Sequence, residues 1–166
     1  VDLKAFTEDF YFKLCGGHLQ PVLDTLVYLV KETGVWTEIT TLLIPGKNDS
    51  DEEIEAESKW IMKELGPDVP VHFTAFHPDY KMTDVGPTTA AMLLHASRIA
   101  REAGLRYVYA GNLPGRVGQL ENTSCRQCGE LLIARYGYLI QKYALTPEGD
   151  CPTCGVHLPG RWARAF

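Results

Sequence analysis

Four cysteines in the last third of the sequence form two identical C-x-x-C-G motifs. The first holds Cys125 and Cys128, and the second holds Cys151 and Cys154, with the 22 residues 129–150 between them. Two thiolates three positions apart converge on one ion when the backbone turns, and the glycine that follows can adopt the positive φ of such a turn. Four thiolates make a closed tetrahedral site that suits Zn²⁺ or a single iron ion. We expect zinc, with iron possible, because nothing in this segment requires electron transfer.

Two disulfides or four free buried thiols are the alternatives to a metal site. A disulfide within a C-x-x-C motif is strained, and nothing in the sequence indicates secretion. Cysteines grouped in metal-binding motifs instead indicate a reducing compartment, so we expect a cytoplasmic protein. We expect no membrane partner, because no apolar run approaches the ~18 residues of a membrane-spanning helix.

Polar residues near the ends of predicted strands are the other candidates for chemistry. Asp2 and Lys4 are two positions apart, so their side chains share one face of a strand, and His77 ends a later strand. Parallel α/β folds bind ligands at the carboxyl ends of their strands, which makes these three residues the candidate ligand contacts. The Asp–Lys pair can bind a zwitterionic or hydroxyl-bearing ligand, or its two charges can simply neutralise each other in an ion pair. The spacing does not distinguish these two alternatives.

Other reactive side chains give weaker signals. Glu38 is expected to be a buried carboxylate that needs a partner, which Lys4 could supply. His72 lies mid-strand and is expected in the core or in a barrel wall, and Asn112 follows the last strand, where it could contact a ligand. Cys15 is expected to be a buried or incidental thiol rather than a nucleophile.

The elements that must position these residues alternate between strand and helix. Strands are predicted at residues 1–6, 35–44, 69–76 and 105–110. Helices are predicted at residues 21–32, 48–65 and 87–104, the acids of residues 48–57 being a solvated helix start rather than a metal site. This alternation implies parallel strands joined by right-handed crossovers. We therefore expect an α/β fold with half or more of a β/α barrel, or an open sheet, over residues 1–115. A four-cysteine module with a hairpin at 131–145 follows over residues 116–166.

Composition sets limits on partners. The chain has 166 residues, 45% of them hydrophobic, which suffices for one substantial core and a small appendage. A net charge of −5 argues against nucleic acid as a partner. The basic aromatic tail at 161–166 either contacts a partner or packs on its own domain. The sequence begins without Met, at the end of a predicted strand, so we expect it to be the C-terminal part of a longer protein.

Three motifs in order resemble a known family. These are the D-L-K sequence at 2–4, the I-P-G-K-N-D sequence at 44–49 and the F-H-P sequence at 76–78. They resemble the second half of radical S-adenosylmethionine (radical SAM) enzymes of the glycyl-radical-enzyme activating type, typified by the pyruvate formate-lyase activating enzyme. The cysteine motifs after residues 107–112 are similar to those of a narrower branch, the radical SAM enzyme of the AmmeMemoRadiSam system.

The resemblance implies a partial β/α barrel that binds S-adenosylmethionine (SAM) and a [4Fe–4S] cluster. The full-length enzyme would cleave SAM reductively to a 5′-deoxyadenosyl radical. By position, Asp2 and Lys4 match the family's D-x-K contact to SAM, and His77 matches its histidine contact. The cluster motif C-x-x-x-C-x-x-C is absent, and only Cys15 remains beside the four ribbon cysteines. We therefore expect this chain alone to be inactive and to need a missing N-terminal half that carries the cluster, with a protein substrate or partner possible.

Two other functions fit the same residues. In the first, the zinc ribbon and the basic tail form a binding module on an α/β scaffold. In the second, the four-cysteine site is a rubredoxin-like iron centre that carries electrons. Metal analysis distinguishes the iron carrier, and a C-x-x-x-C-x-x-C motif encoded upstream distinguishes the enzyme.

Overall fold

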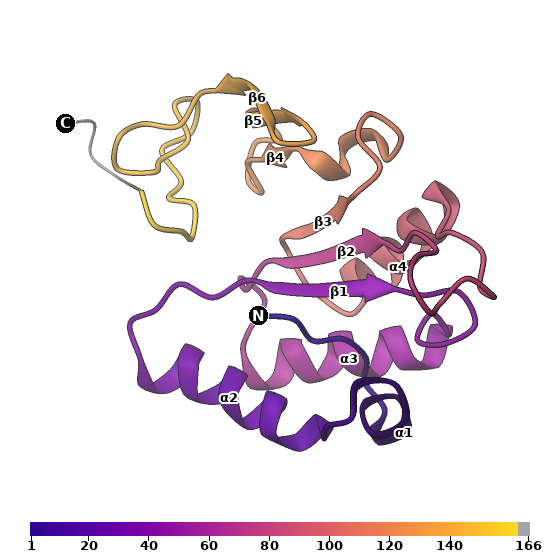
Figure 1. Cartoon of the computed structure of the whole chain (residues 1–166). Coiled ribbons are helices and arrows are strands. Elements are labelled where there is room, and N and C mark those ends of the chain that lie inside the picture. The colour runs from indigo at the N-terminus through magenta and orange to yellow at the C-terminus, as the bar shows by residue number, and fades with distance from the viewer. Residues whose placement is uncertain (163–166) are drawn as a thin grey trace.

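A computed structural model describes residues 1–162, so most of the tail at 161–166 lies outside the described residues. Strands β1 (Ile39–Leu43), β2 (Val71–Ala75) and β3 (Val108–Gly111) form a parallel sheet in the order β1-β2-β3 (Figure 1). The mixed α/β class and the parallel direction of the strands are thus confirmed.

The chain start runs beside β1 without forming a regular strand. The Leu3 N–H donates to the Thr40 carbonyl at 3.0 Å, and the Thr40 N–H donates to the Val1 carbonyl at 2.9 Å. These bonds make one parallel bridge between Asp2 and Thr40. The prediction of four strands was therefore wrong by one, because the first segment contributes a bridge next to a three-stranded sheet.

Three helices cover one face of the sheet (Figure 1). They are α2 (Leu19–Glu32), α3 (Asp51–Glu64) and α4 (Ala90–Glu102). Ser50 and Thr89 cap α3 and α4, each accepting a hydrogen bond from the backbone N–H three residues ahead. The short helix α1 (Glu8–Phe10) and the π-helical turn η1 (Tyr11–Cys15) were not predicted, because they are too short to show a hydrophobic period.

The core lies between the sheet and the helices. Alternate strand residues point toward the helices, so every second residue of each strand is buried. This buried face includes Leu3, Ile39, Leu43, Val71, Phe73, Val108 and Ala110. The intervening residues lie on a second face that none of α2, α3 and α4 covers. We call this the helix-free face, and it carries Asp2, Lys4, Glu38, Thr40, His72, Thr74 and Tyr109.

The last third of the described chain forms a small antiparallel sheet, here called the ribbon. It follows a 3₁₀ helix η2 (Gly118–Glu121) and contains β4 (Thr123–Ser124), β5 (Leu131–Tyr136) and β6 (Leu139–Tyr143). The predicted hairpin is confirmed, with Gly137 at φ 56° in its turn. The ribbon has a buried cluster of its own, which consists of Cys125, Leu132, Ile133, Leu145, Cys151 and Leu158.

The strands are shorter than predicted. The first register pair joins Ile39 to Val71, so the predicted strand residues 35–38 precede the hydrogen-bonded ladder. The register likewise begins at Val108 in the third strand, which shortens the predicted range 105–110 at its start. Within residues 1–162, none of the helices is both long and apolar enough to cross a membrane.

Candidate functional site

The four cysteines of the ribbon form a group that could bind a metal such as zinc or iron. Their four Sγ atoms all lie within 4.8 Å of one another. Cys125 and Cys154 are 3.5 Å apart at sulfur, and Cys128 and Cys151 are 3.6 Å apart. A tetrahedral ion with Zn–S bonds near 2.3 Å requires sulfurs roughly 3.8 Å apart, whereas a disulfide requires about 2.0 Å. The cysteines are free thiols, and their spacing fits a metal ion rather than two disulfides.

The two cysteine motifs have the same backbone geometry. In the first, the Cys125 N–H donates to the Glu130 carbonyl and the Gly129 N–H donates to the Cys125 carbonyl. The second repeats both bonds, from Cys151 to Val156 and from Gly155 to Cys151. Gly129 and Gly155 have φ values of 78° and 71°, which favour glycine at both turns. The sequence repeat therefore becomes a repeated structural turn that presents two sulfurs each time.

Neighbouring groups lower the pKa of one of these thiols and raise the pKa of another. Burial opposes ionisation of Cys125, but the backbone N–H groups of Cys128 and Gln127 and the nearby thiols lower the pKa of Cys125 to about 6. The backbone N–H of Val156 favours the Cys154 thiolate, yet burial and the surrounding cysteines raise the pKa of Cys154 to about 12. One thiolate forms readily, and further ionisation needs a cation to balance the charge.

Two of the predicted ligand-contact residues lie alongside β1, with Asp2 level with Thr40 near its amino end and Lys4 level with Leu42 toward its carboxyl end. Asp2 and Lys4 are exposed and form an ion pair, with Lys4 Nζ 3.3 Å from Asp2 Oδ2. The backbone at Lys4 is fixed, because its N–H donates to the Tyr11 hydroxyl at 3.0 Å and its carbonyl accepts from Asn48 Nδ2 at 2.6 Å. The Phe6 N–H donates to Glu53 at 2.7 Å. Helix η1, helix α3 and the loop before it therefore position the D-L-K segment.

Asn48 lies just after β1 and bonds to three backbone groups there. It is 2% exposed, and its Nδ2 donates to the carbonyls of Lys4 and Leu42 at 2.6 and 2.9 Å. Its Oδ1 accepts from the Ile44 N–H at 2.7 Å. A single side chain thus joins the D-L-K segment to the end of β1 and to the loop that follows. This contact gives a physical reason for an asparagine in the I-P-G-K-N-D motif.

His77 lies just beyond the carboxyl end of β2 and is exposed. Its neighbour Phe76 is held by Thr88, whose hydroxyl accepts from the Phe76 N–H at 3.0 Å and donates to the Leu43 carbonyl at 2.5 Å. Within residues 1–162, no hydrogen bond or ion pair joins His77 to Asp2 or Lys4. Asp2 and Lys4 are thus bonded to each other, whereas His77 follows the carboxyl end of β2 and Asp2 is level with Thr40 near the amino end of β1.

Glu38 has a different partner from the one predicted. Its carboxylate accepts from Trp36 Nε1 at 2.9 Å and lies 2.7 Å from His72 Nε2. Its side chain is 45% exposed, so the prediction of a buried carboxylate was also wrong. The bridge between Asp2 and Thr40 places Lys4 level with Leu42, four residues from Glu38 and roughly 13 Å along the strand. Lys4 pairs with Asp2 for that reason.

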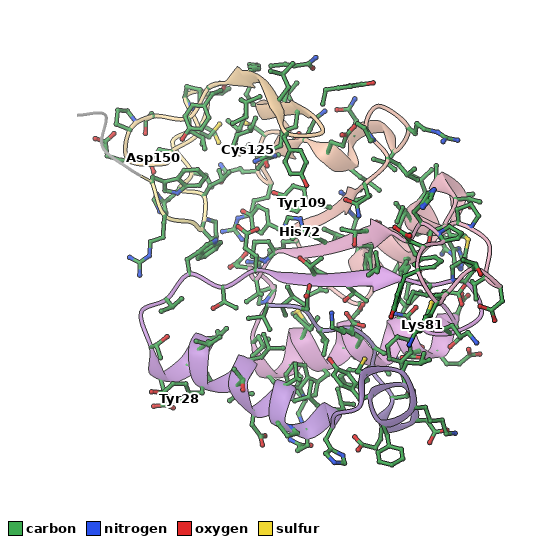
Figure 2. The ribbon with its side chains drawn as sticks, in the orientation of Figure 1. Tyr28, His72, Lys81, Tyr109, Cys125 and Asp150 are labelled. Carbon is green, nitrogen blue, oxygen red and sulfur yellow. The ribbon has the colours of Figure 1, made fainter. Side chains whose placement is uncertain are left out.

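A chain of contacts connects the pair of Glu38 and His72 to the ribbon. The His72 and Tyr109 rings stack with centroids 5.0 Å apart, and Figure 2 shows both side chains between the sheet and the ribbon. The Tyr109 hydroxyl is 2.9 Å from Thr123 Oγ1, which also accepts from Arg135 Nη1 at 2.9 Å. The hydrogen bond to His72, helped by that from Trp36, outweighs burial and lowers the pKa of Glu38. Burial raises the pKa of Tyr109, so its hydroxyl stays protonated at neutral pH.

Sequence reasoning did not identify His72, Tyr109 and Arg135 as site residues. A usable signal existed in β2, where polar His72 and Thr74 alternate with buried Val71 and Phe73. Parallel strands covered on both faces are apolar almost throughout, so alternation in a parallel strand indicates an open face. Cys15 is exposed at the end of η1, which corrects the alternative of a buried thiol.

Comparison with known proteins finds a longer relative. The chain is 44% identical over 156 residues to the uncharacterized protein MJ0808 of Methanocaldococcus jannaschii. The match covers 93% of this chain and 46% of the relative, so the chain spans about half the length of the curated relative that it matches. No family model matches the chain. The likeness therefore includes both the parallel sheet and the ribbon.

Proposed function

We propose that this chain is the C-terminal part of a radical SAM enzyme of the activating type. The complete protein would use a [4Fe–4S] cluster to cleave SAM reductively to a 5′-deoxyadenosyl radical, which abstracts hydrogen from a substrate. In this chain, Asp2, Lys4 and His77 would contact SAM. The proposal rests on the family resemblance of the three motifs, together with the geometry of the helix-free face.

The helix-free face carries the argument. Parallel sheets are normally covered by helices on both faces, yet here three helices lie on one side, and the other side carries ionised and hydroxyl side chains and is covered only in part, by the ribbon. The strand order β1-β2-β3, with the chain start beside β1, is the order of a β/α barrel, in which such a face points inward. A partial barrel with a polar interior therefore accounts for both the topology and the polarity.

The cluster would be bound outside this chain. Four of the five cysteines belong to the ribbon group, which leaves Cys15 as a single thiolate. One thiolate does not hold a four-iron cluster. We therefore propose that the N-terminal half of the complete protein supplies the cluster and covers part of the helix-free face.

Zinc is the metal proposed for the ribbon. Four thiolates in closed tetrahedral geometry are typical of structural zinc sites, and a mainly aliphatic cluster surrounds them. The second candidate is an iron centre that carries electrons, which the same sulfur geometry accommodates. Elemental analysis separates the two, since an iron site colours the protein red and a zinc site leaves it colourless. The free thiols fit a cytoplasmic location for either metal.

Anaerobic reconstitution tests the enzyme assignment. This chain and the longer archaeal relative are each treated with iron and sulfide, and iron, sulfide and visible absorbance are measured. We expect a four-iron cluster on the relative and none on this chain. A stable four-iron cluster on this chain, or its absence from the relative, would contradict the proposal.

A SAM-binding measurement sharpens the same test. In the reconstituted relative, the residue aligned with Lys4 is replaced by Met, and the residue aligned with exposed Lys59 serves as the control. We expect the first substitution to weaken SAM binding at least tenfold, because a hydrogen bond to a charged group is worth about 1.5–3 kcal/mol. Equal binding by both variants would remove the D-x-K pair from the SAM site.

A further inference from the structure

A cavity of about 830 Å³ lies between the helix-free face and the ribbon. His72 and Tyr109 line it from the sheet, and Thr123 and Arg135 line it from the ribbon. Figure 2 shows His72 and Tyr109 in the space between these two layers. Small-molecule sites typically measure about 300–1,000 Å³, so the cavity is large enough for a ligand of many atoms.

Aromatic rings form much of its lining. Trp36, Tyr107 and Tyr109 all line the cavity, and the ring of Tyr109 already stacks on that of His72. Aromatic faces of this kind favour planar rings through offset or edge-to-face contacts. The lining therefore suits a planar aromatic ligand better than a flexible aliphatic one.

The two carboxylates that line the cavity are already engaged. Glu38 is bonded to Trp36 and His72. Glu121 accepts the backbone N–H groups of Gly115 and Gly137 at 2.7 and 2.8 Å. Neither carboxylate is therefore left to bind a cationic ligand.

Two cations line the cavity in the described part of the chain: Arg161, which donates to the Gly34 carbonyl, and Arg135. Arg135 donates to uncharged groups. Its Nη1 donates to the Thr123 hydroxyl at 2.9 Å and to the Glu121 backbone carbonyl at 3.2 Å. Within residues 1–162, no carboxylate oxygen lies within 4.0 Å of its guanidinium nitrogens. A partly buried guanidinium without a carboxylate matches a planar anion such as a carboxylate or sulfonate.

The hydroxyl of Tyr107 does not face the cavity, although the residue lines it. Tyr107 is 7% exposed and lines the cavity, and its hydroxyl has no hydrogen-bond partner in the described part of the chain. Because less than 1 Å² of this oxygen is accessible, it lies behind the cavity wall, and only the rest of the side chain is available to a ligand.

We propose that this cavity binds a small aromatic carboxylate, with its ring against Trp36 and Tyr109 and its anionic group at Arg135. The cavity lining includes Thr40, which bridges to Asp2, and extends to Asn112 beyond the carboxyl end of β3, but Asp2 and Lys4 do not line it. The site rests on the cavity and its lining alone, so it stands whether or not the complete protein cleaves SAM.

The experiment uses 2-naphthoate as the probe and 2-naphthalenemethanol as its uncharged counterpart. Each is titrated into the metal-loaded, ¹⁵N-labelled chain, and backbone amide shifts are followed by NMR. We expect saturable shifts at His72, Tyr109 and Thr123 with naphthoate, and at least tenfold weaker binding of the alcohol. Shifts confined to the exposed strand β6, or equal affinity for both probes, would overturn the proposal.

Variants identify the groups responsible. Arg135→Gln is expected to weaken naphthoate binding at least tenfold and to leave binding of the alcohol unchanged, whereas the exposed Arg116→Gln control changes neither by more than twofold. Tyr107→Phe removes a hydroxyl that does not face the cavity, so it is expected to leave naphthoate binding unchanged and serves as a second control. Bound metal and amide dispersion report whether each variant is folded. If Arg135→Gln is folded and binds naphthoate as the parent chain does, the proposed site is wrong.

Discussion

The parallel sheet and the ribbon are stabilised in different ways. The sheet buries a cluster of twenty residues under three helices, including the fully buried Leu26, Ile61 and Phe73. The ribbon buries six, and two of these, Cys125 and Cys151, belong to the metal group. Cores of that size rarely support a fold without a metal or a disulfide. The sheet should therefore fold by packing, whereas the ribbon should depend on its metal.

Metal removal should have the largest effect, and it should be confined to the ribbon. Structural zinc contributes ~10 kcal/mol or more of apparent binding free energy, which acts as folding free energy. Chelation, or replacement of Cys151 by Ser, should unfold residues from about 120 onward and leave the sheet and its helices folded. Hydrogen exchange followed by mass spectrometry measures both regions at once. Unchanged protection of β5 after chelation would show that the ribbon does not need the four-thiolate site.

Truncation of Phe73 should destabilise the sheet and leave the ribbon unaffected, which is the reverse of the effect of metal removal. Phe73 is fully buried between β2 and the helices, so Phe73→Ala should cost about 3–5 kcal/mol of unfolding free energy in the sheet. The metal-binding affinity of the ribbon should remain unchanged. Tyr143→Ala, at a position 54% exposed on β6, is the control and should cost far less. Denaturant titration gives the free energies, and a loss of metal affinity in Phe73→Ala would argue that the two regions are not independent.

The sheet region also contains a buried acid that should make its stability depend on pH. Glu57 is 2% exposed on α3 and accepts the Thr41 hydroxyl at 2.7 Å. Burial raises the pKa of Glu57 from 4.5 to about 8. The folded state holds this proton between about pH 4.5 and 8 while the unfolded state releases it, so stability should fall by a few kcal/mol as pH rises through that window.

A matched pair of variants isolates this effect. Glu57→Gln keeps an uncharged polar group at the position, so its unfolding free energy should depend much less on pH. Glu55→Gln, on the exposed side of α3 beside Lys59, should leave the parent dependence intact. Denaturant titrations at pH 5 and pH 8 measure both. A parent chain as stable at pH 8 as at pH 5 would mean that Glu57 is ionised in the folded state.

The smallest effect is expected at the junction of the two regions. Glu38 and His72 are 45% and 30% exposed at their side chains, and partly exposed ion pairs contribute at most about 1 kcal/mol. Glu38→Gln should therefore lower the unfolding free energy by less than about 1 kcal/mol, as measured by urea titration. A cost of several kcal/mol would mean that the ribbon and the sheet are coupled through this pair.

Local signals predicted most of the fold. Hydrophobic periods predicted the three long helices, and the repeated cysteine motif predicted the metal group, because each of these signals acts within a few residues. The acidic helix start was read as solvated throughout, but Glu57 is buried, since it lies on the same helix face as Ile54 and Ile61.

Contacts between distant segments could not be predicted in this way. The partner of Glu38 depends on the register of β1 against β2 and against the chain start. This register cannot be predicted from a single sequence. Arg135 reaches the sheet only because the ribbon lies over the helix-free face. The residues proposed to contact SAM were therefore chosen from motifs alone, whereas the cavity could be recognised only from the positions of the sheet and the ribbon in space.

Formation of 5′-deoxyadenosine tests the proposed function most directly. The reconstituted longer relative is reduced with dithionite in the presence of SAM, and the product is quantified by chromatography and mass spectrometry. The account predicts catalytic formation of 5′-deoxyadenosine, which falls at least tenfold when the residue aligned with Lys4 is replaced by Met. A fully loaded four-iron protein that forms no 5′-deoxyadenosine under these conditions would contradict it.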